Sequence, residues 1–241
     1  MQEKLEAQFS GVKIRRIRMD LEEMASVKAA VCELLREPLD GLILNAGAYH
    51  IPRRKCDTGL DNVFQINFAS PYFMVRQLLP TLRSRCGRVV VVGSIAHDYS
   101  KSDGNDIDFS TRTRASRVYG NAKRYLMFSL YELFRAEREV TLSVTHPGIT
   151  FTNITSHYPK LIFAVIKHPM KVIFMKPRKA ALSILHGVFE PVGYFEWIGP
   201  RVFDVWGYPT KKRLKTATPE ESREIAARAE KIYSDLLNTQ I

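Results

Sequence analysis

Cysteine is scarce in this 241-residue chain, and its scarcity excludes two kinds of scaffold. The three cysteines, Cys32, Cys56 and Cys86, are too few and too scattered for a disulfide framework, and none forms a C-x2-C pair with metal-ligand spacing. We therefore predict no metal site. Unpaired cysteines are typical of a reducing compartment, so we expect a cytoplasmic protein.

The sequence also lacks long apolar runs and has fewer acidic than basic residues. The sequence contains no apolar run long enough to cross a bilayer. Its 25 acidic residues are outnumbered by 36 basic ones, which gives a net charge of +11. Such an excess is compatible with nucleic acid, an anionic membrane or an anionic cofactor. The basic clusters are separated and lack interleaved aromatic residues, so we expect no nucleic-acid partner.

Several apolar runs predict the strands of a sheet. Buried strands are predicted in 41–47, 87–94 and 140–145, a last strand in 193–199, and a half-buried edge strand in 12–19, where apolar and basic residues alternate. Helical patterns separate these runs. The edge strand ends at Asp20. This residue can also be read as the N-cap of the helix that follows.

The helix predicted from Arg117 to Phe134 carries a pair of residues with useful chemistry. Tyr119 and Lys123 are four positions apart, so they share one face of the helix. A free tyrosine has a pKa of about 10, and an adjacent cation would lower that pKa toward neutrality. On its own, such a pair is more often an aromatic residue at the core edge and a solvated lysine.

Small and polar residues follow the predicted strands at the points where each strand ends. They are Asn45, Ala46 and Gly47 after the first buried strand, Ser94 after the second, and Pro147, Gly148 and Thr152 after the third. Asn67 lies in a helical segment between the first two. The carboxyl ends of parallel strands line one crevice, which is where such sheets bind ligands.

These features, in this order, resemble the short-chain dehydrogenase/reductase family. The insert I-A-H-D-Y-S-K-S-D-G-N-D-I-D-F-S, from Ile95 to Ser110, is similar to that of its retinol-dehydrogenase-like branch. The resemblance implies an α/β fold with a Rossmann-like doubly wound parallel sheet, with residues 1–241 forming one domain. It also implies an NAD(P)-dependent oxidoreductase that interconverts an alcohol and a carbonyl by hydride transfer.

The resemblance assigns a role to each candidate residue. Tyr119 would pass the proton, Lys123 would lower its pKa and hold the ribose, Ser94 would polarise the substrate oxygen, and Asn67 would hold a relay water. The implied cofactor-binding residues are Asp20 near the adenine, Asn45, Ala46, Gly47, Tyr119, Lys123, Pro147, Gly148 and Thr152. Two structural roles stay open: Ser94 could cap the next turn, and Asn67 could bond a carbonyl freed where Pro71 bends its helix.

The sequence departs from the family at its beginning. The family's first strand leads into a T-G-x3-G-x-G turn that binds the cofactor pyrophosphate, and no such turn occurs here. We therefore expect a missing N-terminal βαβ portion, a gap between the strand at 12–19 and the strand at 41–47, weak or absent NAD(P)H binding, and marginal stability. The alternative function is a non-catalytic member of the fold that binds a partner.

Two later segments carry further expectations. The apolar stretch 155–177 is predicted to be a substrate lid, which favours a lipophilic substrate and leaves peripheral membrane contact open. Thr218, Pro219 and Glu221 form the start signal of a C-terminal helix, with Thr218 as N-cap and Glu221 placed for a capping box. We expect this helix to be surface structure or a subunit contact, as in a homo-oligomer.

Overall fold

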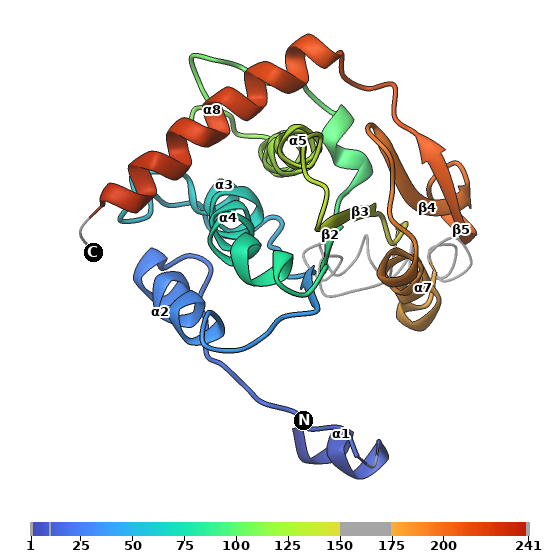
Figure 1. The fold of residues 1–241 in the computed structure, drawn as a ribbon. Helices are drawn as coiled ribbons and strands as arrows, with labels where there is room; N and C mark the ends of the chain where they lie inside the picture. Colours follow the sequence, from blue (N-terminus) through green and yellow to red (C-terminus); the bar gives the residue numbers. More distant parts are fainter. Residues whose placement is uncertain (1, 10, 150–174, 240–241) are drawn as a thin grey trace, which may run out of the picture.

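The computed structural model describes residues 2–9, 11–149 and 175–239 of the chain. Its strands are β1 (Gly41–Leu44), β2 (Arg88–Val92), β3 (Thr141–Thr145), β4 (Glu196–Val202) and β5 (Trp206–Arg213). They form one sheet in the order β1-β2-β3-β4-β5. The pairings from β1 to β4 are parallel, and β5 returns antiparallel to β4 (Figure 1). The predicted α/β class is confirmed.

Helices cover both faces of this sheet. The helices α2 (Met24–Leu34), α4 (Ser70–Arg83) and α5 (Ala115–Leu133) pack on one side, and α7 (Pro177–Phe189) packs on the other. The last helix, α8 (Pro219–Asn238), crosses the outside of α5 (Figure 1). The main core lies between the sheet, α4, α5 and α8, and it includes Leu78, Val91, Leu126 and Ile225.

The strand β2 and the central helix α5 are buried along most of their length. Residues 89–92 of β2 are all buried, as expected for a parallel strand covered on both faces. Every residue from Gly120 to Tyr131 in α5 is buried, because α8 covers the face that would otherwise meet solvent. The helix predicted from Arg117 to Phe134 is therefore confirmed, with its start two residues earlier.

The predicted edge strand at 12–19 is wrong. Those residues form no ladder, and Arg15 in their middle pairs instead with Glu33 and Glu37 around the end of α2. A strand needs a hydrogen-bonding neighbour, and no described strand lies beside this segment. The expected gap in the sheet consequently does not arise. Instead β1 is an edge strand, with Ile43 half exposed, among the described residues.

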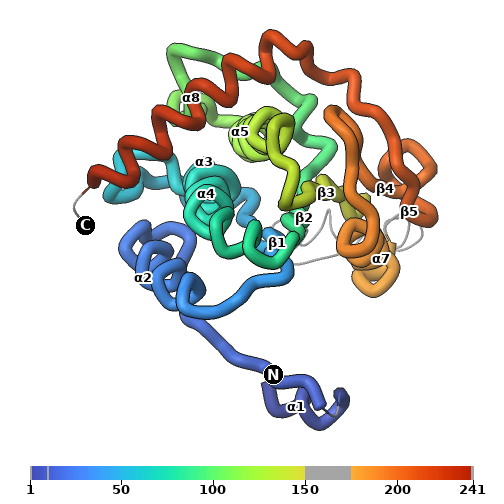
Figure 2. Tube along the Cα trace, viewed as in Figure 1, coloured from blue at the N-terminus to red at the C-terminus, as the bar shows by residue number. Residues whose placement is uncertain are grey.

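The N-terminal region is attached loosely to the rest. Helix α1 (Gln2–Gln8) buries none of its residues and stands apart from the α/β body, joined by the extended segment (Figure 2). The alternative role of Asp20 as an N-cap is also wrong, because α2 begins at Met24 with Glu23 as its N-cap. The Asp20 carboxylate instead accepts a hydrogen bond from the Glu22 backbone N–H, at 2.9 Å.

At the C-terminal end, one strand was not predicted, and the last helix buries one of its faces. The predicted strand at 193–199 is present as β4, but β5 was not predicted; Pro209 within it is tolerated because β5 is an edge strand. Thr218 caps α8 as predicted, accepting from the Glu221 backbone N–H. The Glu221 carboxylate pairs with Arg124 instead of completing a capping box. One face of α8 packs on the core and the other lies at the surface, as expected for surface structure.

The predicted lid at 155–177 lies almost wholly outside the described residues. Of that segment, the structure describes Met175, which is buried, Lys176, and Pro177 at the start of α7. None of the helices in the described part of the chain is both long enough and apolar enough to span a membrane.

Candidate active site

The carboxyl ends of β1, β2 and β3 face the first half of α5, and the candidate residues gather there. Lys123 links them. It is 2% exposed, and its Nζ donates a hydrogen bond to the carbonyl oxygen of Val92, the last residue of β2, at 2.9 Å. The same Nζ lies 5.7 Å from the centre of the Tyr119 ring. Burial lowers the pKa of Lys123 to about 8.

Asn67 and Gly47 complete the side of the site next to β1. Asn67 lies in η1 (Gln65–Ala69), a π-helical turn between the short helix α3 (Asn62–Phe64) and α4. Its Nδ2 donates to the Ala48 and Val63 carbonyl oxygens at 2.7 and 2.8 Å, and its Oδ1 accepts from Ala48 N–H at 3.2 Å. A Cβ at Gly47 would lie 2.6 Å from Asn67 Oδ1 and 3.6 Å from Lys123 Nζ. Only glycine fits there.

Ser94 and Tyr119 face each other across the other side of the site. The Ser94 hydroxyl is near enough to the Tyr119 hydroxyl to lower its pKa, but burial dominates and raises that pKa to about 12. Burial therefore outweighs the hydroxyl contact in this structure, and the expectation that Lys123 lowers the Tyr119 pKa stays a prediction. The Lys123 ammonium bonds to the Val92 carbonyl oxygen and lies over the Tyr119 ring. Ser94 also caps the turn η2 (Ile95–Asp98), accepting from Ala96 N–H at 3.2 Å.

Two glycines bring the supporting backbones together. A Cβ at Gly120, next to Tyr119, would lie 2.1 Å from the Ala96 carbonyl oxygen, so α5 touches the backbone of the Ser94 turn directly. A Cβ at Gly93 would lie 2.8 Å from Met127 Sδ. A side chain at position 120 would push α5 away from the Ser94 turn, whereas one at position 93 would require the Met127 side chain to move.

The remaining predicted residues are only partly brought to the site. Pro147 and Gly148 follow β3, and Gly148 has a φ of +78° with Val205 carbonyl oxygen 2.6 Å from where its Cβ would be. Thr152 lies outside the described residues. Asp20 is exposed, and its side chain bonds within its own turn, not with the four catalytic candidates. Asn45 and Ala46 directly follow β1 and are exposed.

Sequence reasoning missed a buried network behind the site. Arg124 is 1% exposed, and its guanidinium donates to Glu221, to the His97 carbonyl oxygen at 3.1 Å and to the Thr216 carbonyl oxygen at 2.8 Å. The His97 Nδ1 donates to the Ser94 carbonyl oxygen at 2.6 Å, so its Nε2 accepts from the Thr216 hydroxyl at 2.7 Å. Burial lowers the His97 pKa, which favours this neutral form. The network ties α8 to the Ser94 turn.

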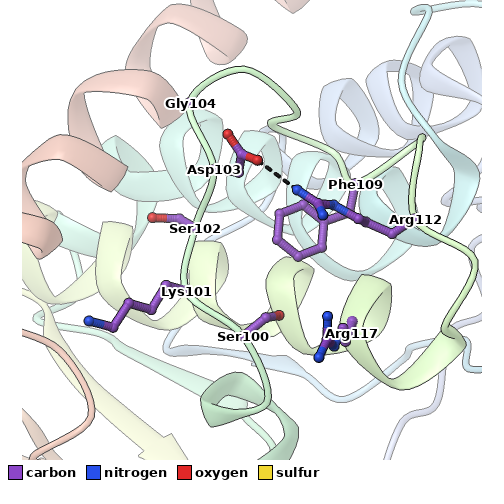
Figure 3. A pocket seen from close by; sticks show the side chains of 8 residues that line it. All are labelled: Ser100, Lys101, Ser102, Asp103, Gly104, Phe109, Arg112 and Arg117. Atoms are coloured by element: carbon purple, nitrogen blue, oxygen red, sulfur yellow. Dashed lines mark hydrogen bonds and ion pairs between the residues drawn. The ribbon is translucent and has the colours of Figure 1, made fainter.

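A pocket of about 320 Å³ lies between the insert and the first turns of α5 (Figure 3). Phe109 lines it and also packs with Val118 in a small cluster that Tyr119 contacts, so the pocket adjoins the site. Arg112 at its rim pairs with Asp103 at 2.7 Å, drawn as the dashed line in Figure 3. Among the described residues, no group of histidine, cysteine and carboxylate side chains is placed to hold a metal ion.

Replacing Lys123 with methionine is expected to stabilise the protein by about 2 kcal/mol at pH 7. The folded pKa of about 8 lies below the usual lysine value of about 10.4, so folding disfavours the charged form. This penalty is complete below the folded pKa and disappears as the pH rises through the unfolded pKa. Urea denaturation at pH 7 and at about pH 10 should therefore show a gain that shrinks at the higher pH.

Lys231→Met is the matched control, because Lys231 is exposed on α8 and its replacement should change stability little. A lower stability of Lys123→Met at pH 7 would mean that Lys123 is not held as an unpaired buried cation.

Comparison with known proteins agrees with this architecture. Residues 1–105 match the family model described as short chain dehydrogenase. Mouse retinol dehydrogenase 14 is 34% identical over 144 residues, which are 58% of this chain and 43% of that protein. Human polyprenol dehydrogenase is 28% identical over 203 residues, 78% of this chain and 60% of that protein. The chain spans about half the length of the retinol dehydrogenases 14 that it matches.

Solved structures share the fold. A protein of unknown function from Mycobacterium paratuberculosis superposes with a TM-score of 0.68 at 20% identity, covering 98% of this chain and 80% of that one. An alcohol dehydrogenase from the archaeon Thermococcus sibiricus, solved with 5-hydroxy-NADP, gives a TM-score of 0.57 at 17% identity, covering 90% and 81%. Such identities establish the Rossmann-like fold alone. The family model and the curated relatives support the assignment of this chain to the short-chain dehydrogenase/reductase family, on its retinol-dehydrogenase-like branch.

Proposed function

We propose that the protein is an NAD(P)-dependent oxidoreductase that interconverts an alcohol and a carbonyl on a lipophilic substrate. The observation that carries the proposal is the meeting of Tyr119, Ser94, Lys123 and Asn67 at the carboxyl edge of the sheet. A phenol facing a hydroxyl, with a buried ammonium behind the ring, suits proton transfer to a carbonyl oxygen.

The residues on this edge fit the ribose and nicotinamide half of a dinucleotide. Lys123 carries three donor hydrogens and, within the described residues, gives one of them to protein, so two remain for ribose hydroxyls. Asn45, Ala46 and Gly47 offer exposed backbone beside it, and Pro147 and Gly148 close the opposite side. When bound, the nicotinamide supplies or accepts the hydride. The proposed cofactor is NAD(P), without a choice between NAD and NADP.

Tyr119 is the proposed proton donor in carbonyl reduction. With its pKa raised to about 12, the phenol keeps its proton at neutral pH and can donate it as negative charge develops on the substrate oxygen. The Ser94 hydroxyl donates to the same oxygen. Asn67 fixes the backbone at Ala48, and its Oδ1 keeps one lone pair with which to hold a relay water beside Lys123.

The names of the curated relatives favour retinoid or polyprenyl substrates. Retinol dehydrogenase 14 and polyprenol dehydrogenase are named for isoprenoid alcohols. We propose that this chain takes an alcohol or aldehyde of that lipophilic class. The aromatic side chain of Tyr49, which meets the Tyr119 ring edge-on at 5.4 Å, would contact the apolar part of such a substrate next to the reacting group.

The test is a reduction assay with retinal, a polyprenyl aldehyde and the polar control glyceraldehyde. Because the sequence lacks the pyrophosphate-binding turn, NADPH and NADH are supplied well above ordinary concentrations. We expect kcat/KM to be at least about tenfold higher for the lipophilic aldehydes than for glyceraldehyde. Activity confined to the polar aldehyde would overturn the substrate class.

The second candidate is a non-catalytic protein that binds a partner through the same fold, and the missing glycine-rich turn is the observation that favours it. It predicts no turnover with any aldehyde and no heat of binding when the chain is titrated with NADPH. Turnover that depends on Tyr119 would exclude it.

A further inference from the structure

The tip of the β4–β5 hairpin has an unusual turn. Phe203 and Asp204 are its central residues, with φ of +50° and +57°, and the Val205 N–H donates to the Val202 carbonyl oxygen at 3.0 Å. Two successive positive φ values are typical of a type I′ turn, where asparagine and glycine are preferred. A phenylalanine in this region is strained, and it is 89% exposed, so burial within the described fold does not compensate for the strain.

Other apolar side chains surround this ring. Val202, Trp206 and Tyr208 are 44%, 47% and 72% exposed, and Trp206 pairs with Val202 across the hairpin. Trp206 and Tyr208 lie on one face of β5, since they are two positions apart, and Lys179 lies 4.0 and 5.3 Å from the centres of their rings. We call Val202, Phe203, Trp206 and Tyr208 the hairpin patch.

The charges around the hairpin patch are positive. Lys176 and Arg178 at the start of α7, and Arg201 in β4, are exposed and pair with no carboxylate among the described residues. The one carboxylate of the turn, Asp204, is bonded to Lys212 at 2.9 Å. Aromatic residues bordered by unpaired Lys and Arg suit the boundary between anionic head groups and acyl chains.

We propose that the hairpin patch docks the protein on an anionic lipid surface. A second copy of the chain fits less well, because a two-fold interface would place the cations of one patch against those of the other. The hairpin also lies at the site's edge of the sheet: the Val205 carbonyl oxygen is 2.6 Å from the Cβ position of Gly148. Docking there would bring the candidate active site to the bilayer. The benefit of this position for substrate uptake rests on the proposed function; the docking itself does not.

The test is sedimentation with vesicles of phosphatidylcholine, with and without about one third phosphatidylserine. The unchanged chain should bind the anionic vesicles at least about tenfold more tightly, and salt should weaken that binding. Phe203→Asn with Trp206→Ser should reduce binding about tenfold. Asparagine suits the positive φ of residue 203, so this variant should keep its thermal melt. Arg178→Gln with Arg201→Gln should reduce binding similarly at low salt.

Matched controls lie elsewhere on the surface. Phe189 is 72% exposed at the far end of α7, about 18 Å along the helix from Pro177, and Phe189→Asn should leave binding unchanged. Arg138→Gln, beyond the end of α5, combined with Lys231→Gln on α8, removes the same two charges and controls for net charge.

No binding to anionic vesicles, or equal binding by the Phe203→Asn, Trp206→Ser variant, would overturn the proposal. The proposal would also be overturned if the unchanged chain formed a dimer without lipid and the Phe203→Asn, Trp206→Ser variant were monomeric. The hairpin patch would then bind a second copy of the chain. Reduction of detergent-dispersed retinal is measured separately: loss of turnover with vesicle binding intact counts against the proposed function and leaves the docking proposal standing.

Discussion

Turnover is expected to fall by about 10²–10⁴-fold when Tyr119 is replaced by phenylalanine, because this change removes the proposed proton donor and little else. The ring keeps its edge-on contact with Tyr49 at 5.4 Å and its place over Lys123. Binding of NADPH, measured by calorimetry, should therefore change little, so that kcat falls while the cofactor Kd stays nearly constant.

Tyr99→Phe is the control for the loss of a phenol. Tyr99 is 51% exposed on the insert that begins after Ser94, and its replacement should leave kcat unchanged. If Tyr119→Phe kept more than about a tenth of the turnover, proton transfer would have to pass through another group.

Replacing Arg124 with methionine is expected to lower the free energy of unfolding by about 3 kcal/mol. Methionine fills the space of the side-chain stem but leaves the His97 and Thr216 carbonyl oxygens without their donors and Glu221 without its partner. Glu221 is partly solvated, which places the expected loss at the lower end for a broken buried pair. Urea denaturation followed by circular dichroism measures the difference.

Arg223→Met supplies the comparison, since Arg223 on the same helix pairs with Glu220 at 2.8 Å in solvent. Its loss should cost at most about 1 kcal/mol. Equal effects of the two replacements would show that the buried network contributes no more than a surface ion pair. Adding Glu221→Gln to Arg124→Met should recover part of the stability, because the unpaired carboxylate is then removed.

The local sequence pattern was sufficient to predict the strand β2 and the helix α5. The valines of β2 and the spacing of Tyr119 and Lys123 each specify a structure on their own, and both elements formed as predicted. The order of the motifs then placed Ser94, Gly47 and Lys123 at the same edge of the sheet. Whether these residues act in catalysis stays a prediction.

Prediction from the sequence failed where the structure of a residue depends on a packing partner that is distant in the chain or absent from the described residues. Residues 12–19 have the alternation of a strand, but a strand forms only against a neighbour, and none is described there. Arg124 follows Lys123 in an amphipathic pattern and would be expected in solvent; α8, almost a hundred residues later, buries it. Burial also raises the Tyr119 pKa, and the spacing of Tyr119 and Lys123 along the helix does not reveal that burial.

The contact between Gly120 and the Ala96 carbonyl has a consequence for efforts to change the proposed substrate range. Because two backbones meet there, the spacing between Ser94 and Tyr119 is set without help from any side chain that would line a substrate site. Libraries that vary Tyr49, Phe109 or the rim of the insert can therefore be large without disturbing the reacting pair. Position 120 is the exception, and a library that includes it would lose most of its members before substrate choice could be measured.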